Sequence, residues 1–347
     1  MSPKKRTLSA GSQVRPTPDP KDPKDALMVL APTTRLARIP SPARFLLVAL
    51  GSLVVSSVLF TLTASLTRGD LGLVSKHLEE WWEVGGLIAW RGVEVGLAWV
   101  LGFDSWDVAS YLFLTHLPTY SLLWFFYKVR PTSVLASYAI TILSTVIPFA
   151  FLRRSASVHD LSHTPSDAIV NRGILQDRLT TIYTSLAATS IYSVILYASY
   201  ASWLPAQLVV HFESIPDISA AHAGPAGLPA LFLSLVPAGY AVRDFLFVSS
   251  TGRSTAKEAK QPASREGEYL IVAIYRKTWC QLSMKTRILV SRTLILATAV
   301  LLNTTVQVAG TIQSVSVEGA STWGAIWAVA TLATGATFGW IEAVDGV

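Results

Sequence analysis

The chain has 347 residues, of which 51% are hydrophobic and only 14% charged, and its mean hydropathy is +0.45. Soluble globular domains carry about 25% charged residues, so this composition excludes a water-soluble body of this size and predicts a membrane protein. The net charge of +6 fits basic loops that face anionic lipid, and we expect no nucleic-acid partner. The single cysteine, Cys280, excludes an intramolecular disulfide framework.

Residues 1–40 form a basic, proline-rich tail. Few large apolar residues are present there, so we expect this segment to be disordered. The first apolar run begins only near Phe45, too far from the start for a secretory signal peptide. The stretch "PKKR" at 3–6 also fits a nuclear localisation signal, but we interpret it as part of a solvated basic tail beside a membrane surface.

Eight apolar blocks follow, each near the ~20 residues that a helix needs to cross a bilayer. Trp and Tyr gather at the block ends, as they do at membrane–water interfaces. The sequence therefore predicts an all-α, polytopic transmembrane helical bundle over 44–347, with a polar cytosolic loop at 249–286. The predicted spans are 44–67, 85–103, 108–127, 132–152, 180–204, 228–248, 287–310 and 320–342.

The distribution of Lys and Arg predicts the orientation, because these residues mark the cytoplasmic side of short loops. The tail and the loops at 153–179 and 249–286 are basic, whereas the loops at 205–227 and 311–319 contain no Lys or Arg. With eight spans, the basic segments all lie on one side. Both termini are therefore predicted to be cytosolic.

The short link at 128–131 departs from this pattern, since Lys128 and Arg130 would face outward. If 85–127 is instead a re-entrant pair, six spans remain and every later loop keeps its side. Eight spans are favoured because 108–127 is long and strongly apolar.

Two charges lie inside the second apolar block. Arg91 and Glu94 are three residues apart and so share one helix face. They form either a self-neutralising structural pair or part of an ion, proton or anion route. Gly92 and Gly96 lie beside them with the spacing that lets another helix approach closely.

Two further polar residues lie within the apolar blocks, His116 and Asn303. His116 is either a proton relay and partner for Glu94, or a neutral ring bonded to a backbone carbonyl that Pro118 frees. Asn303 is interpreted as an interhelical hydrogen-bonding group together with Thr304.

The last block, 320–342, carries small residues at three- and four-residue spacing, among them Gly335 and Gly339. This stripe predicts a packing seam within the bundle or between protomers.

Two loops contain groups with metal-ligand chemistry. The stretch "HDLSH" places His159, Asp160 and His163 close together, in a loop where a helix is doubtful. The second group lies in the predicted outer loop, where it would form a metal site or the entrance to a substrate site: His211, Glu213, Asp217 and His222. Neither matches a motif with known mechanics, so we interpret both as solvated loops and predict no metal site.

Two segments outside the spans have the composition of interfacial amphipathic helices. Residues 72–86 place Leu73, Leu78 and Trp81 on one helical face, with acidic residues mostly on another. Residues 267–287 mix apolar and basic side chains and lead into the seventh span.

The function predicted from these features is that of a non-catalytic scaffold or membrane-organising protein in the endoplasmic reticulum or another organelle membrane. Its partners would be the lipid bilayer and membrane proteins that dock on the Gly92/Gly96 and Gly335/Gly339 seams. A transporter or channel that uses Arg91, Glu94 and His116 is the first alternative, and a membrane-embedded lipid enzyme is the second. No catalytic residue set and no cofactor are predicted, because no motif for either is present.

Overall fold

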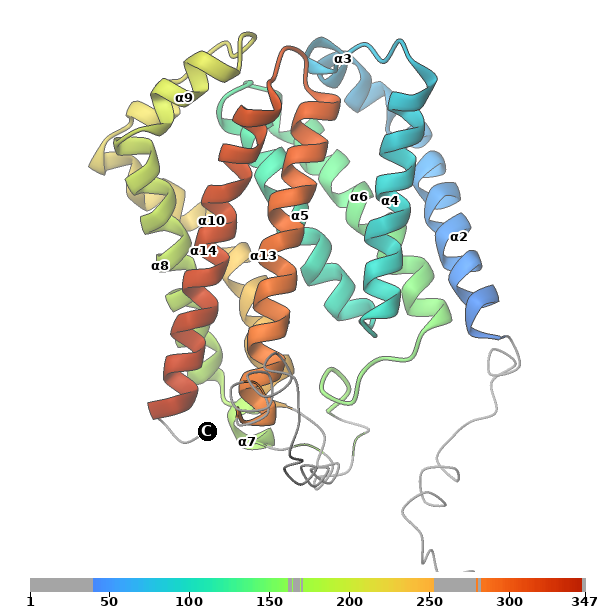
Figure 1. The fold of residues 1–347 in the computed structure, drawn as a ribbon, viewed down its shortest axis with the longest axis vertical. Coiled ribbons are helices and arrows are strands. Elements are labelled where there is room, and N and C mark those ends of the chain that lie inside the picture. Colours follow the sequence, from blue (N-terminus) through green and yellow to red (C-terminus); the bar gives the residue numbers. More distant parts are fainter. Residues whose placement is uncertain are drawn as a thin grey trace, which may run out of the picture. The chain divides into compact units, whose positions relative to one another are not determined.

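The computed structural model describes residues 40–161, 164, 169, 171–252, 279 and 282–344 (Figure 1). The chain divides into two units, Met1–Ala43 and Arg44–Val347. All interactions given below lie within the second unit. The predicted disordered tail, apart from its last residue Pro40, lies outside the described residues.

The described residues form helices and no strand, which agrees with the predicted all-α class. The short helices are α3 (Ala64–Val74), α7 (Arg172–Gln176), α9 (Leu204–His211), α11 (Ser249–Thr251) and the 3₁₀ segments η3 (Ser219–His222) and η4 (Pro225–Gly227). The long helices are α2 (Ser41–Leu62), α4 (Trp81–Val100), α5 (Ser105–Phe125), α6 (Pro131–Leu152), α8 (Arg178–Ala201), α10 (Leu228–Val242), α13 (Met284–Thr311) and α14 (Val317–Val344). A π-helical segment, η5 (Arg243–Val248), joins α10 to α11.

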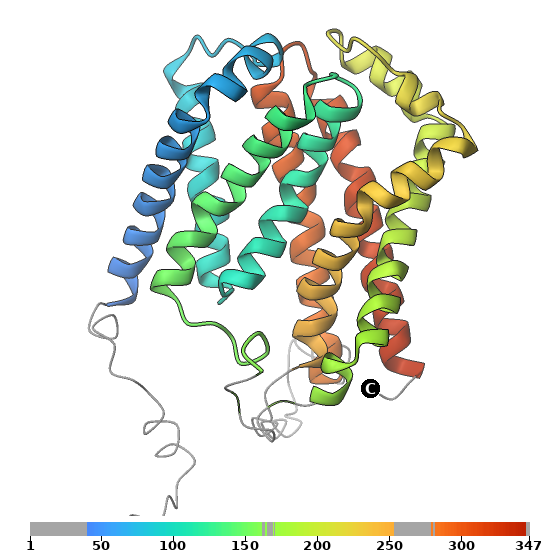
Figure 2. The ribbon, with the colours of Figure 1, turned by 180° about the vertical axis from the view of Figure 1, so that it is seen from behind.

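The long helices alternate in direction along the chain (Figures 1 and 2). One end of the second unit carries α3, the link between α5 and α6, α9, and the turn between α13 and α14; we call it the α3 end. The opposite end carries the α4–α5 turn, α7 and the last residues of α14; we call it the α7 end. The described residues that flank the basic loop 249–286, at the end of α11 and the start of α13, also lie at the α7 end.

Six helices in the described residues are long and apolar enough to cross a membrane. They are Ser41–Leu62, Pro131–Leu152, Arg178–Ala201, Pro225–Thr251, Met284–Thr311 and Val317–Val344. The two long helices outside this set are α4 and α5, of 20 and 21 residues. Both are continuous and about 30 Å long, but α4 carries Glu83, Arg91 and Glu94.

The first predicted span and the predicted helix at 72–86 need correction. Helix α2 ends at Leu62 and α3 begins at Ala64, so the predicted span 44–67 is two helices. Residues 75–80 are not helical, so 72–86 is not one amphipathic helix. The cause is backbone pairing with the α13–α14 turn, because Lys76 N–H donates to the Thr311 carbonyl at 2.8 Å and Gln313 N–H donates to the Val74 carbonyl at 3.0 Å. Most of the predicted helix at 267–287 lies outside the described residues.

The two predicted glycine seams differ in what they contact. A Cβ atom at Gly335 would lie 2.3 Å from Thr293 Cγ2 of α13, and one at Gly339 would lie 3.6 Å from Leu289. The α14 stripe therefore packs within this chain. At Gly92 a Cβ atom would meet nothing within 4 Å, and at Gly96 it would meet only the Phe45 ring, at 3.9 Å.

The basic link between α5 and α6 is neutralised by acids at the same α3 end. Lys128 Nζ lies 2.9 Å from Asp217 Oδ2, and Arg130 Nε lies 2.5 Å from Asp70 Oδ2. The charges that depart from the loop pattern in the sequence are thus paired in the fold.

Candidate functional site

The charges inside α4 form a three-residue group, which we call the mid-helix cluster: Arg91, Glu94 and His116. Arg91 Nη1 lies 3.0 Å from Glu94 Oε2, and His116 Nε2 of α5 lies 3.1 Å from Glu94 Oε1. The Glu94 side chain is only 3% exposed. The fold therefore brings together the three residues that the sequence marks, with the carboxylate between the two nitrogen groups.

Helix α6 completes the hydrogen bonding of Arg91. Arg91 Nη2 donates to the Thr141 carbonyl at 2.8 Å and to the Thr145 hydroxyl at 2.5 Å. The Thr141 hydroxyl in turn lies 2.9 Å from the Tyr120 hydroxyl. A buried charge is stable only when it is paired and hydrogen-bonded, and for the Arg91 guanidinium Glu94 of α4 and the two threonines of α6 meet that condition.

Asn303 joins three helices. Its Nδ2 donates to the Thr115 carbonyl of α5 at 3.0 Å, and its Oδ1 accepts from Trp90 Nε1 of α4 at 2.8 Å. Asn303 thus acts between helices, as its position in an apolar block suggests. The neighbouring Thr304 hydroxyl, which the sequence groups with it, is buried and has no hydrogen-bond partner among the described residues.

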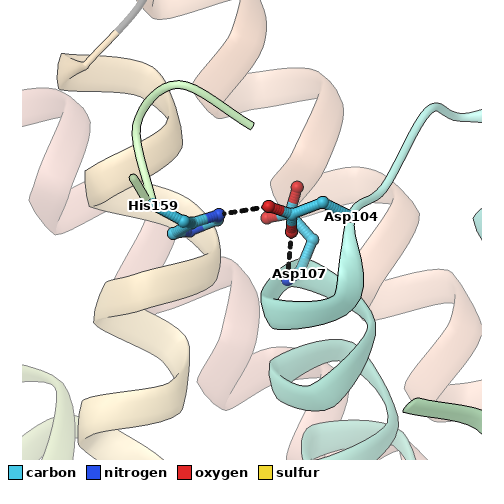
Figure 3. Close-up of side chains that lie close together, drawn as sticks. All are labelled: Asp104, Asp107 and His159. Atoms are coloured by element: carbon cyan, nitrogen blue, oxygen red, sulfur yellow. Dashed lines mark hydrogen bonds and ion pairs between the residues drawn. The ribbon is translucent and has the colours of Figure 1, made fainter. Parts of the chain in front are cut away.

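A second charged group lies at the α7 end and was not predicted as a unit. We call it the α7-end cluster: Asp104, Asp107, His159 and Arg292. Asp104 precedes α5, and its Oδ1 accepts from Asp107 N–H at 2.8 Å, which caps the helix. Its Oδ2 accepts from Ala156 N–H and pairs with His159 Nδ1, both at 2.8 Å (Figure 3). Asp104 therefore fastens the loop after α6 to the start of α5.

Asp107 and Arg292 form the strongest ion pair of this cluster. Arg292 donates from Nη1 to Oδ1 at 2.6 Å and from Nη2 to Oδ2 at 2.9 Å, a two-bond geometry that suits guanidinium and carboxylate. The Arg292 guanidinium also lies over the Phe245 and Phe103 rings, at 4.8 and 5.1 Å from the centroids. Helices α5, α13 and the π segment η5 are thereby held together.

The pKa shifts in the α7-end loops follow from this geometry. Burial alone would raise the pKa of Asp104, but hydrogen bonds from His159 and from the backbone N–H groups of Asp107 and Ala156 outweigh it and lower that pKa. Burial alone would lower the pKa of His159, but its bond to Asp104 and the nearby carboxylates of Asp107 and Asp244 raise it. Each group favours the charged form of the other.

Among the described residues, Asp104, Asp107 and His159 are also the group whose ligand atoms lie close enough to hold a metal ion, within 4.8 Å of one another. The donors are already engaged, however. Both Asp104 oxygens accept hydrogen bonds, and both Asp107 oxygens face Arg292. A cation thus already occupies the place that a metal would take, and the geometry fits an ion-pair network better than a metal centre. Of the predicted "HDLSH" group, His163 lies outside the described residues.

In the described residues, no hydrogen bond or ion pair joins the four predicted outer-loop residues to one another, and three of their side chains have separate partners. His211 Nδ1 lies 2.9 Å from the Ser316 hydroxyl, and His222 Nδ1 lies 3.2 Å from the Ile218 carbonyl. Asp217 pairs with Lys128, and Glu213 N–H donates to the Ser314 carbonyl at 3.2 Å.

Aromatic rings pack beside the α7-end cluster, and one of them, Tyr111, lies between Asp107 and His116 along α5. Phe103 packs against Tyr111 and Phe245 with centroid distances of 5.7 and 5.2 Å, and all three rings are buried. Asp107 and His116 are nine residues apart on α5, or about 14 Å. The charged groups are thus separated by apolar packing.

The α7-end cluster was missed because its parts are far apart in the sequence. Arg292 lies inside the predicted span 287–310, and Arg243 and Asp244 lie inside 228–248. A charged residue within an apolar block is a signal of a buried charged site. The sequence analysis applied this signal to Arg91 and Glu94 but not to these three residues.

The part of the chain that the structure describes is thus all-helical, with apolar helices of spanning length and two internally paired charge clusters. Residues 177–306, roughly a third of the chain, match the family model of the Bouquet formation protein 3 C-terminal domain. The matched segment begins at Asp177, which caps α8, and ends within α13, so it contains Arg292 and Asn303 but not the mid-helix cluster. No curated protein and no solved structure matches the chain.

Proposed function

We propose that this chain is a multi-span membrane protein that organises other proteins in an organelle membrane, as a scaffold rather than a catalyst. The observation that carries the proposal is the match of residues 177–306 to a bouquet formation protein domain, in a segment that supplies two of the six apolar helices and most of a third. We further propose that the membrane is that of the endoplasmic reticulum or nuclear envelope.

The proposed arrangement has eight spans, with α4 and α5 crossing as full helices and both termini in the cytosol. Its support is the alternation of the long helices, which places the helix ends that flank the basic segments 153–179 and 249–286 at the α7 end (Figure 1). Lys128 and Arg130 are the charges that oppose this sidedness, and in the folded protein they are paired with Asp217 and Asp70.

Transport is the first alternative, and the packing favours the scaffold over it. Glu94 is paired with Arg91 and His116, and the buried Tyr111 lies between His116 and Asp107 along α5. A membrane enzyme is the second alternative, and its predicted loop site is dispersed over separate partners.

The open face of α4 is the surface that we propose for a partner helix. Gly85, Gly86 and Gly92 have nothing within 4 Å of a Cβ position. Small residues allow helices to approach closely in a membrane, and on α14 the equivalent surface is already filled by α13.

The experiment compares Gly92→Leu with wild type in cells, using crosslinking through the membrane followed by native electrophoresis of the detergent extract. We expect a complex larger than the chain alone in wild type and its loss in Gly92→Leu, with unchanged thermal stability, since the new side chain meets open space. Val84→Leu is the matched control, because that residue is exposed on the same helix.

A flux assay separates the alternatives. Purified wild-type protein in liposomes is tested for proton, cation and anion flux, with the Arg91→Met/Glu94→Gln double variant beside it. Flux that the double variant abolishes would overturn the scaffold proposal in favour of transport, and an intact complex in Gly92→Leu would exclude α4 as the docking surface.

A further inference from the structure

A cavity of about 420 Å³ lies at the α3 end, between α2 and the inner helices. Its outer wall is formed by Leu53, Ser56 and Phe60 of α2, and its inner walls by α4, α5, α6 and α13. This volume lies within the usual range of small-molecule sites. The scaffold proposal makes no use of it.

The deep wall of the cavity is polar but without net charge. Arg91, His116 and Tyr120 line this wall. Glu94, which does not line the cavity, neutralises the charge of Arg91. The lining residue Thr119 is 7% exposed, and its hydroxyl has no hydrogen-bond partner among the described residues. An unsatisfied buried hydroxyl is unfavourable, so a bound group that reaches Thr119 would remove a cost.

The depth of this wall limits what can reach it. Arg91 is near the middle of the 20-residue helix α4, hence near mid-depth in the proposed bilayer. Charged head groups do not reach that depth without a large penalty. An uncharged head group with few hydrogen-bonding atoms loses far less on leaving water.

The outer wall is loosely packed, which provides a route from the bilayer. Only Val48 and Ser52 of α2 are buried. Leu53 and Phe60, which line the cavity, are 42% and 37% exposed. A lipid entering sideways past α2 would meet apolar side chains first and the polar wall last.

We propose that this cavity binds a neutral membrane lipid with a hydroxyl head group, the chemistry shared by sterols and diacylglycerols. The hydroxyl hydrogen-bonds at Thr119, Tyr120 and His116, and the apolar body lies along Leu53, Phe60 and Leu87. The inference rests on the proposed membrane placement and is independent of the scaffold role.

The test uses the full-length protein in nanodiscs that contain a photoactivatable sterol or a photoactivatable diacylglycerol, followed by peptide mapping. We expect one of the two probes to label peptides of α2 and α5, with competition by the unlabelled lipid. A matching phosphatidylserine probe should not give competed labelling there.

Two substitutions place the site. Leu53→Trp should fill the cavity and reduce labelling about tenfold, whereas Val54→Trp, at the adjacent position and 62% exposed, should not reduce it. Thr119→Val should weaken labelling without lowering thermal stability, because it removes an unpartnered hydroxyl.

Equal labelling of the two tryptophan variants, or no competed labelling by either neutral probe, would overturn the proposal. Competed labelling by phosphatidylserine would overturn it as well. If the protein fails to enter nanodiscs at all, the membrane placement fails instead, and the two failures are thereby distinguished.

Discussion

In the mid-helix cluster, Arg91 and Glu94 lie three residues apart on one helix. In the α7-end cluster, Asp107 and Arg292 lie 185 residues apart in the sequence, on two different helices. Both clusters bury a carboxylate beside a guanidinium. In the first, local spacing alone brings the charges together, and His116 adds a third group from α5. In the second, the Asp107–Arg292 pair forms only when α5 and α13 have docked. The comparison indicates that the α7-end cluster depends on the tertiary fold and the mid-helix cluster depends on it far less.

The largest effect is expected from Arg292→Met. It leaves the Asp107 carboxylate, whose side chain is 4% exposed, without its two-bond partner. Loss of one partner of a buried pair costs about 3–5 kcal/mol, which we expect as a large fall in the thermal unfolding midpoint in detergent. The double variant Arg292→Met/Asp107→Asn should recover most of it. Arg178→Met, at an exposed position, is the control. If Arg292→Met and Arg178→Met lower the unfolding midpoint equally, the Asp107–Arg292 pair contributes no more stability than an exposed arginine.

A smaller effect is expected from Arg91→Met in the mid-helix cluster. Glu94 keeps its contact with His116, so we expect a loss of about 2–3 kcal/mol, below the usual cost of breaking a buried pair. Adding Glu94→Gln should restore stability, because a neutral amide needs no charged partner. Thermal unfolding of the two single variants and the double variant gives the coupling energy. Strictly additive losses would contradict the pairing.

His159→Gln should lower stability in a pH-dependent way. The folded pKa of His159 is raised, so its contribution is complete below the unfolded pKa of about 6.5 and is lost as pH rises through the folded pKa. The Asp104 pKa is lowered, so its contribution is lost only in acid, as pH falls through the folded value. At pH 6 we expect a loss of about 1.5–2 kcal/mol.

The measurement is the unfolding midpoint of wild type and His159→Gln from pH 6 to 9. The gap between them should narrow as pH rises. A gap that is constant over this range would show that the imidazolium–Asp104 bond is not its cause.

The smallest effect is expected from His116→Gln. The Gln side chain keeps an N–H donor for Glu94, so the loss should stay below about 1 kcal/mol. His116→Leu removes the donor and should cost clearly more in the same unfolding assay. If both variants lose stability equally, the contact between His116 Nε2 and Glu94 Oε1 contributes nothing.

The apolar blocks predicted the long helices well, because length and hydropathy are local properties of the sequence. All eight predicted spans have a long helix at their position, with boundary shifts of a few residues for most. The helix at 72–86 was wrong, since backbone bonds to the distant α13–α14 turn decide the conformation of residues 75 and 76. Arg91 and Glu94 were recognised by their spacing. Arg292 and Asp107 were not, because no local pattern encodes which helices meet.

The ion pairs of the α5–α6 link also bear on how the chain is threaded during synthesis. The insertion machinery reads Lys and Arg as each hairpin emerges and gives little weight to acids. Asp217, the partner of Lys128, is translated long after that link has left the ribosome. In the proposed topology, the link of the α5–α6 hairpin, with Lys128 and Arg130, lies on the outer side, against the positive-inside rule. The more strongly basic segments before and after the hairpin must therefore determine its orientation. Of the two acids that pair with this link in the fold, Asp70 precedes it in the chain and only Asp217 follows it.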